Sequence, residues 1–188
     1  MDAATDRSLR PTDYWLLVLL CALMAAVAFV DGRWLTTHEA THCLNVREMF
    51  ESGNYFLPTY GGRPWLERPP VPHWFTGVPA AVVADCSTTW AMRIGSVLAG
   101  MLAVLATAWA VAGCLGRTVG LLSGATLATM REFAAYAVGP EADIFIAAAV
   151  TLAGALFIRG EFGPNGSRPE RATFFGGRPW PVLGVFVV

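Results

Sequence analysis

The sequence predicts an all-α, polytopic membrane protein. Three observations support this fold class: 55% of the 188 residues are hydrophobic, only 14% are charged, and the mean hydropathy is +0.49. Soluble domains usually carry about 25% charged residues, so the deficit indicates that much of the chain lies in lipid. The net charge of −1 provides no basic field, which argues against a nucleic-acid partner.

Four apolar runs predict membrane-spanning helices, and a fifth begins near the end of the sequence. The first run, residues 14–30, has no charged residue and would rise about 25 Å as a helix, just enough for the hydrocarbon core. A cleaved signal peptide is the alternative, because Ala26-Val27-Ala28 resembles a cleavage site. The spans that follow favour an uncleaved anchor. They are predicted at residues 90–113, 118–138 and 142–158, and from 179 onwards.

The arginines predict the orientation of these spans. Arg7 and Arg10 precede the first span, Arg117 follows the second, and four arginines follow the fourth, at positions 159, 168, 171 and 178. By the positive-inside bias, the N-terminus is cytoplasmic and the loop 31–89 faces outward from a bacterial-type plasma membrane. Because the fifth run is cut off, residues 1–188 are expected to form the N-terminal part of one membrane domain in a longer protein.

Two further patterns concern packing. Gly116, Gly120 and Gly124 are spaced four residues apart, and Ala128 continues the row. Small residues on one helical face allow close approach of a second helix, so this row predicts a packing seam. Cys43 and Cys86 lie in the outer segment and would be able to form a disulfide in an oxidising compartment.

Residues 38–42, His-Glu-Ala-Thr-His, match the H-E-x-x-H pattern of zinc proteases. On a helix, His38 and His42 share a face, and Glu39 would act as the general base. Such a site also needs a third protein ligand, and the only other histidine, His73, lies in a Pro-rich stretch. A membrane zinc metalloprotease is therefore kept as an alternative function.

The longer block at residues 37–75 supports a different interpretation. An acidic residue after the first span is followed by a predicted amphipathic helix ending in REMFESGN, an extended LP and GRPW stretch, and ERPP before Trp74. This order resembles the first outer loop of GT-C-fold glycosyltransferases that use lipid-linked sugars. The most similar group is the protein O-mannosyltransferase and aminoarabinose-transferase superfamily. Arg93 and the stretch GPEADIFIAA also fit, whereas His38 stands where the family has Asp, and Arg68 where it has Lys.

The resemblance implies a mannosyltransferase-like enzyme that moves a sugar from a polyprenyl-phosphate carrier in the lipid bilayer to a glycan, lipid or protein acceptor at the outer face. It implies catalytic roles for Glu39, His38 and Asp143. Contacts to the donor phosphate would come from a set of arginines, namely Arg68, Arg63 and Arg131. A divalent metal ion is compatible with this acidic site but not required by it. The isolated chain is expected to be inactive, since it would lack further helices.

Structural roles compete with these assignments. Thr36 or Thr37 is a suitable N-cap, and Glu39 would then stabilise the first turn of the outer helix. Asp143 would be able to pair with Arg131 without any role in catalysis. A third function therefore stays open, a non-catalytic membrane protein of the same fold, because His38 replaces the first acidic residue of the family pattern.

Overall fold

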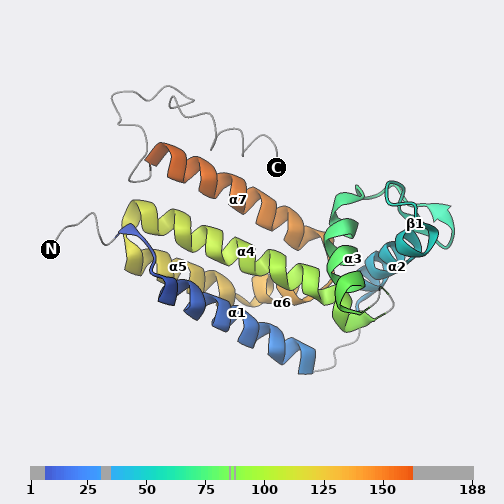
Figure 1. Cartoon of the computed structure of the whole chain (residues 1–188), viewed down its shortest axis with the longest axis horizontal. Helices are drawn as coiled ribbons and strands as arrows, with labels where there is room; N and C mark the ends of the chain where they lie inside the picture. The colour runs from blue at the N-terminus through green and yellow to red at the C-terminus, as the bar shows by residue number, and fades with distance from the viewer. Residues whose placement is uncertain (1–6, 31–34, 85, 87, 163–188) are drawn as a thin grey trace. The chain divides into compact units, whose positions relative to one another are not determined.

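The computed structural model of the chain describes residues 7–30, 35–84, 86 and 88–162. This part of the chain is mainly helical, as predicted, and adds one short antiparallel hairpin (Figure 1). The elements in order are α1 (Pro11–Val30), α2 (Thr37–Ser52), β1 (Thr59–Tyr60), β2 (Arg63–Pro64), α3 (Val71–Val83), α4 (Thr89–Leu115), α5 (Arg117–Thr129), α6 (Arg131–Val138) and α7 (Ala142–Phe162).

Two helices among the described residues are long and apolar enough to cross a membrane, α4 and α7. At 1.5 Å per residue, α4 rises roughly 40 Å and α7 roughly 32 Å, against a hydrocarbon core of about 30 Å. They correspond to the predicted spans at residues 90–113 and 142–158. The apolar stretch of α1, Pro11–Ala26, is shorter. The predicted fifth run, from residue 179, lies outside the described residues.

The predicted span 118–138 is corrected, because it is not one continuous helix. It forms α5 and α6, which are separated at Met130, where ψ is 124° and the backbone is extended. The Thr129 hydroxyl bonds back to the carbonyls of Ala125 and Thr126, which competes with regular continuation of the helix. Arg131 and Glu132 follow, with side chains 95% and 77% exposed.

The structure divides into two compact units. The first contains Met1–Ala22, Met101–Met130 and Ala147–Val188, and the second contains Leu23–Gly100 and Arg131–Ile146. In the first unit, the predicted packing seam is confirmed at Gly120 and Gly124, whereas Gly116 precedes α5 as its N-cap residue, with a φ of 98°. A Cβ atom on Gly120 would overlap Ala112 and the carbonyl oxygen of Ala108, and one on Gly124 would lie 2.9 Å from the Ala108 side chain. These glycines therefore permit close packing of α5 against α4.

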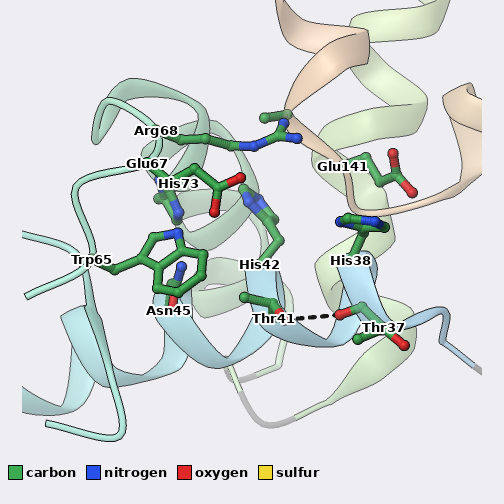
Figure 2. A pocket seen from close by; sticks show the side chains of 11 residues that line it. Thr37, His38, Thr41, His42, Asn45, Trp65, Glu67, Arg68, His73 and Glu141 are labelled. Carbon is green, nitrogen blue, oxygen red and sulfur yellow. Dashed lines mark hydrogen bonds between the residues drawn. The ribbon is translucent and has the colours of Figure 1, made fainter. Parts of the chain in front are cut away.

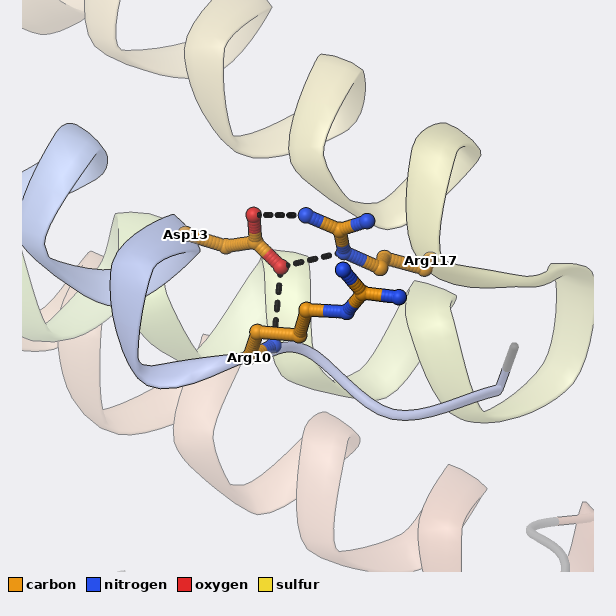
Figure 3. Close-up of polar contacts among 3 residues, drawn as sticks. All are labelled: Arg10, Asp13 and Arg117. Carbon is orange, nitrogen blue, oxygen red and sulfur yellow. Dashed lines mark hydrogen bonds and ion pairs between the residues drawn. The ribbon is translucent and has the colours of Figure 1, made fainter. Parts of the chain in front are cut away.

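An ion pair also stabilises the first unit (Figure 3). Asp13 is 1% exposed, and Arg117 donates to both of its carboxylate oxygens, from Nε and Nη2, at 2.6 Å each. The backbone N–H of Arg10 donates to the same carboxylate at 2.8 Å, which satisfies one amide at the start of α1. The pair thus joins the beginning of α1 to the beginning of α5.

In the second unit, α2 begins with a capping box. The Thr36 hydroxyl accepts from the backbone N–H of Glu39 at 3.2 Å, and the Glu39 carboxylate accepts from the backbone N–H of Thr36 at 2.7 Å. Helix α2 ends at Ser52, and Gly53 follows as its C-terminal cap, with a φ of 69° in the left-handed region. Glu39 therefore has the structural role considered from the sequence, which is to stabilise the first turn of α2.

A single carboxylate attaches the hairpin to α2. Glu48 accepts hydrogen bonds from the Thr59 hydroxyl and the Gly61 N–H at 2.7 Å each, and from the Gly62 N–H at 3.2 Å. Both glycines have positive φ values, 60° and 73°, which direct these amides into the turn. The Thr59 hydroxyl and these amides together lower the pKa of Glu48.

The Pro-rich stretch after the hairpin forms a helix, α3, which packs on α2. Pro72 is tolerated there because it lies in the first helical turn, where its missing N–H costs no hydrogen bond. Both Cys43 and Cys86 pack against the same buried cluster, which includes Val46 and Met92. Both are free thiols, so the disulfide considered from the sequence is not formed in this structure.

Candidate functional site

The second unit contains a cavity of about 170 Å³ (Figure 2). Its wall is built from one face of α2, the segment after β2, the start of α3 and the residues where α7 begins. The lining residues are Thr37, His38, Thr41, His42, Asn45, Trp65, Glu67, Arg68, His73, Glu141 and Ala142. Pockets for drug-sized ligands measure about 300–1,000 Å³, so this cavity suits the polar head of a ligand and not a whole lipid.

Arg68 contributes a cation to the cavity wall. It also donates from Nη1 to Oδ1 of Asp143 at 3.0 Å, and the two side chains are 35% and 56% exposed. A guanidinium has five N–H donors, so most of them are not used by this bond. The structure therefore brings two predicted residues, Arg68 and Asp143, together, although only Arg68 lines the cavity.

Glu141 contributes a carboxylate to the same wall, and its pKa is raised. Partial burial is the main cause, and the nearby charges of Glu39 and Asp143 add to it. His38 and Arg68 act in the opposite direction. A carboxyl group with a raised pKa in a cavity is typical of acid–base sites. Glu141 was not among the site residues predicted from the sequence, although the stretch GPEAD contained it.

The two adjacent candidates on α2 are placed differently. His38 lines the cavity beside Glu141 (Figure 2). Glu39 is 1% exposed, does not line the cavity, and is engaged in the capping box. Its carboxylate also lies so close to Gly139 that a Cβ atom there would overlap it. Glu39 is therefore not part of the cavity wall, but its charge still raises the pKa of Glu141.

The other two predicted arginines do not line the cavity. Arg63 lies on β2, where both residues are exposed. Arg131 has a 95% exposed side chain, with Glu132 at 3.9 Å. Of the three arginines predicted to bind phosphate, only Arg68 lines the cavity.

Two histidines form a stacked pair in the wall. The rings of His42 and His73 have centroids 4.6 Å apart and an interplanar angle of 28°. His42 Nε2 lies 2.9 Å from the Thr76 hydroxyl, and His73 Nδ1 lies 3.2 Å from the Pro69 carbonyl. Burial is the main cause that lowers both pKa values, that of His42 to about 3, and the Arg68 charge also lowers both. Both rings are therefore neutral at physiological pH.

This geometry does not suit the zinc site of the H-E-x-x-H pattern. Such a site needs two histidines and a third ligand around one ion. Within the described part of the chain, no group of three His, Cys, Asp or Glu side chains is placed to hold a metal ion. In addition, His42 Nε2 is bonded to Thr76, and Glu39 is bonded to the helix N-terminus. The residues thus form no metal site of their own, and we assign no catalytic step to a divalent ion.

A family model described as dolichyl-phosphate-mannose-protein mannosyltransferase matches residues 67–161. That segment contains Glu67, Arg68, His73 and Glu141, whereas His38 and Glu39 precede it. No curated protein and no solved structure matches the chain. The match covers half of the chain and agrees with the resemblance seen in its motifs. The chain therefore belongs to the dolichyl-phosphate-mannose-protein mannosyltransferase family of GT-C glycosyltransferases.

Proposed function

We propose that this chain forms the donor-binding part of a glycosyltransferase that moves a sugar from a polyprenyl-phosphate carrier to a hydroxyl-bearing acceptor. The carrying observation is that one cavity contains both a guanidinium, Arg68, and a carboxylate with a raised pKa, Glu141, and that both residues lie in the family-matched segment. Transfer from a lipid phosphate needs a cation for the leaving group and a base for the acceptor. The family description suggests mannose as the sugar.

Arg68 binds the donor phosphate in this proposal. Its guanidinium can form two parallel hydrogen bonds to phosphate oxygens, which gives orientation as well as charge. Asp143 holds the guanidinium through one N–H and leaves other donors for the ligand. Asp143 therefore acts as a positioning residue and need not touch the reacting atoms.

Glu141 acts as the general base. The acceptor oxygen forms a bond to the anomeric carbon, the bond from that carbon to the phosphate oxygen breaks, and the polyprenyl phosphate leaves with the electron pair. The acceptor proton passes to the Glu141 carboxylate. A base is most efficient when its pKa approaches the working pH, and burial together with the Glu39 and Asp143 charges moves Glu141 in that direction.

The general base is then Glu141 and not Glu39, and Glu39 has two other roles. Glu39 stabilises the start of α2 through its capping box, and its charge raises the pKa of Glu141. His38, which lines the cavity beside Glu141, is a second group able to accept or return a proton. Arg63 and Arg131 are assigned no contact with the donor phosphate, since neither lines the cavity.

The membrane placement follows from the two long apolar helices. We propose that α4 and α7 span the bilayer and that the segment with α2, the hairpin and α3 lies at the outer face, with a cytoplasmic N-terminus. The supporting observation is the bias of arginines towards the predicted inner ends. A lipid-borne donor would then reach the cavity from the membrane, and a glycan, lipid or protein acceptor would approach from outside.

The test is a transfer assay on membranes from cells that express the protein from its own gene, with dolichyl-phosphate mannose as donor. Glu141→Gln and Arg68→Ala are expected to abolish or strongly reduce transfer. Arg63→Ala and Arg131→Ala serve as matched controls, because they remove exposed guanidinium groups outside the cavity. Equal loss in all four variants, or full activity in the first two, would contradict the proposal.

A further inference from the structure

The cavity wall contains three buried polar atoms that have no hydrogen-bond partner. They are Nδ1 of His42, Nε2 of His73 and Oδ1 of Asn45, and these residues are 6%, 1% and 1% exposed. All three residues line the cavity. Leaving a buried polar group unpaired costs free energy, so such groups in a native protein call for an unseen partner.

The hydrogen bonds of the two imidazoles identify the chemical character of their unpaired atoms. The Pro69 carbonyl can only accept, so His73 Nδ1 carries the proton, and the unpaired Nε2 of the neutral ring is an acceptor. The Thr76 hydroxyl donates its one proton to the Pro72 carbonyl at 3.2 Å, so it accepts from His42 Nε2. The unpaired His42 Nδ1 is therefore an acceptor as well, and so is Oδ1 of Asn45.

These three acceptor atoms have no hydrogen-bond donor in the protein, so a ligand that binds to them must donate hydrogen bonds. A phosphate oxygen does not fit them, because it only accepts, and an aliphatic lipid chain offers no donor. A sugar ring presents several hydroxyl groups, each with one donor. Arg68 lies close enough to influence both imidazoles, so a group seated against them would be adjacent to the phosphate that Arg68 binds. In a lipid-phosphate donor, that group is the sugar itself.

We propose that His42, His73 and Asn45 form an acceptor-lined wall that binds the hydroxyl groups of the donor's sugar. The inference rests on the proposed function and adds the residues that distinguish a glycosylated carrier from a bare one. These three side chains are specificity residues and take no part in bond breaking.

The test compares binding of two lipids, dolichyl-phosphate mannose and sugar-free dolichyl phosphate, to the protein expressed from its own gene and reconstituted in nanodiscs. The variants His73→Phe and Asn45→Leu remove one acceptor each and keep side chains of similar shape. Each is expected to weaken binding of dolichyl-phosphate mannose about 2- to 13-fold, the range for one neutral hydrogen bond, and to leave binding of dolichyl phosphate unchanged. Glu51→Gln, on the exposed side of α2, is the matched control.

A second readout separates recognition from folding. Asn45→Leu replaces an unpaired buried acceptor with an apolar group of similar shape, which removes a cost in the free protein, so its ligand-free thermal midpoint should be unchanged or higher. His73→Phe also loses the hydrogen bond from Nδ1 to the Pro69 carbonyl, so for this variant the relative affinity for the two lipids is the deciding readout. Equal weakening for both lipids, no weakening for either, or a lower midpoint without lipid discrimination would overturn the inference. If the wild-type protein binds neither lipid, the proposed function itself fails. If it binds both and the variants do not discriminate, only this inference fails.

Discussion

The assignment of the base predicts opposite results for two glutamates that are close in space. In Glu141→Gln the cavity loses its proton acceptor, and we expect transfer to fall about 10²- to 10⁴-fold, the usual contribution of a general base. In Glu39→Gln the new amide oxygen can still accept from the Thr36 N–H, because Gln also completes a capping box. The lost interaction of a buried charge with the helix N-terminus costs up to about 2 kcal/mol of stability.

The same pair of variants makes a prediction about pH. The Glu39 charge raises the pKa of Glu141, so removing it lowers that pKa. A base acts in its deprotonated form, and the acidic limb of the pH–rate profile of Glu39→Gln should therefore move to lower pH. The assay is initial transfer rate against pH for both variants and wild type. A large loss of rate in Glu39→Gln, with an active Glu141→Gln, would refute the reasoning.

Three further predictions concern phosphate binding and stability. Arg68→Ala should raise the KM for the donor about 10- to 100-fold, as expected for one charged hydrogen-bonded contact, and Arg68→Lys should restore part of the loss. Asp13→Asn should destabilise the protein by about 1–3 kcal/mol, measured as a lower thermal midpoint, because it weakens a bidentate pair with Arg117 in which the Asp carboxylate is buried. Glu48→Gln should loosen the hairpin by about 1 kcal/mol. Since the folded pKa of Glu48 is lowered, its stabilisation is complete above its ordinary value of 4.5 and is lost as pH falls through the folded pKa; limited proteolysis at several pH values measures this loss.

Much of the fold was predictable because hydropathy and capping are local properties. The long helices α4 and α7 follow from long, mainly apolar runs, and the start of α2 follows from Thr36 with Glu39 three residues later. The break at Met130 was missed because the predicted span was continued to residue 138, although the charged residues Arg131 and Glu132 directly follow Met130. It depends on a backbone turn and on two charged side chains that are exposed.

The candidate site was only partly predictable, because a motif identifies residues but not the direction in which they face. Arg68 was predicted from its motif and lines the cavity. Asp143 and Glu141 are two residues apart near the start of α7, and only Glu141 lines the cavity. No sequence pattern distinguishes these two carboxylates.

The histidine pair shows a further limit of sequence analysis. His42 and His73 are 31 positions apart and stack only because α3 is a helix that packs against α2. Recognising the pair required the helix in the Pro-rich stretch, which the sequence analysis did not predict. The H-E-x-x-H pattern drew attention to His42 for a different reason, as a zinc ligand.

The central claim is that the polar head of a lipid-linked sugar occupies the cavity between α2 and the start of α7. Photo-cross-linking with a photoactivatable analogue of dolichyl-phosphate mannose, followed by mass spectrometry of the labelled peptides, measures this occupancy without requiring turnover. We expect labelling of the peptides that contain Arg68 and Glu141, suppressed by excess unlabelled dolichyl-phosphate mannose. Labelling confined to the outer faces of the long helices, with no effect of the competitor, would contradict the account.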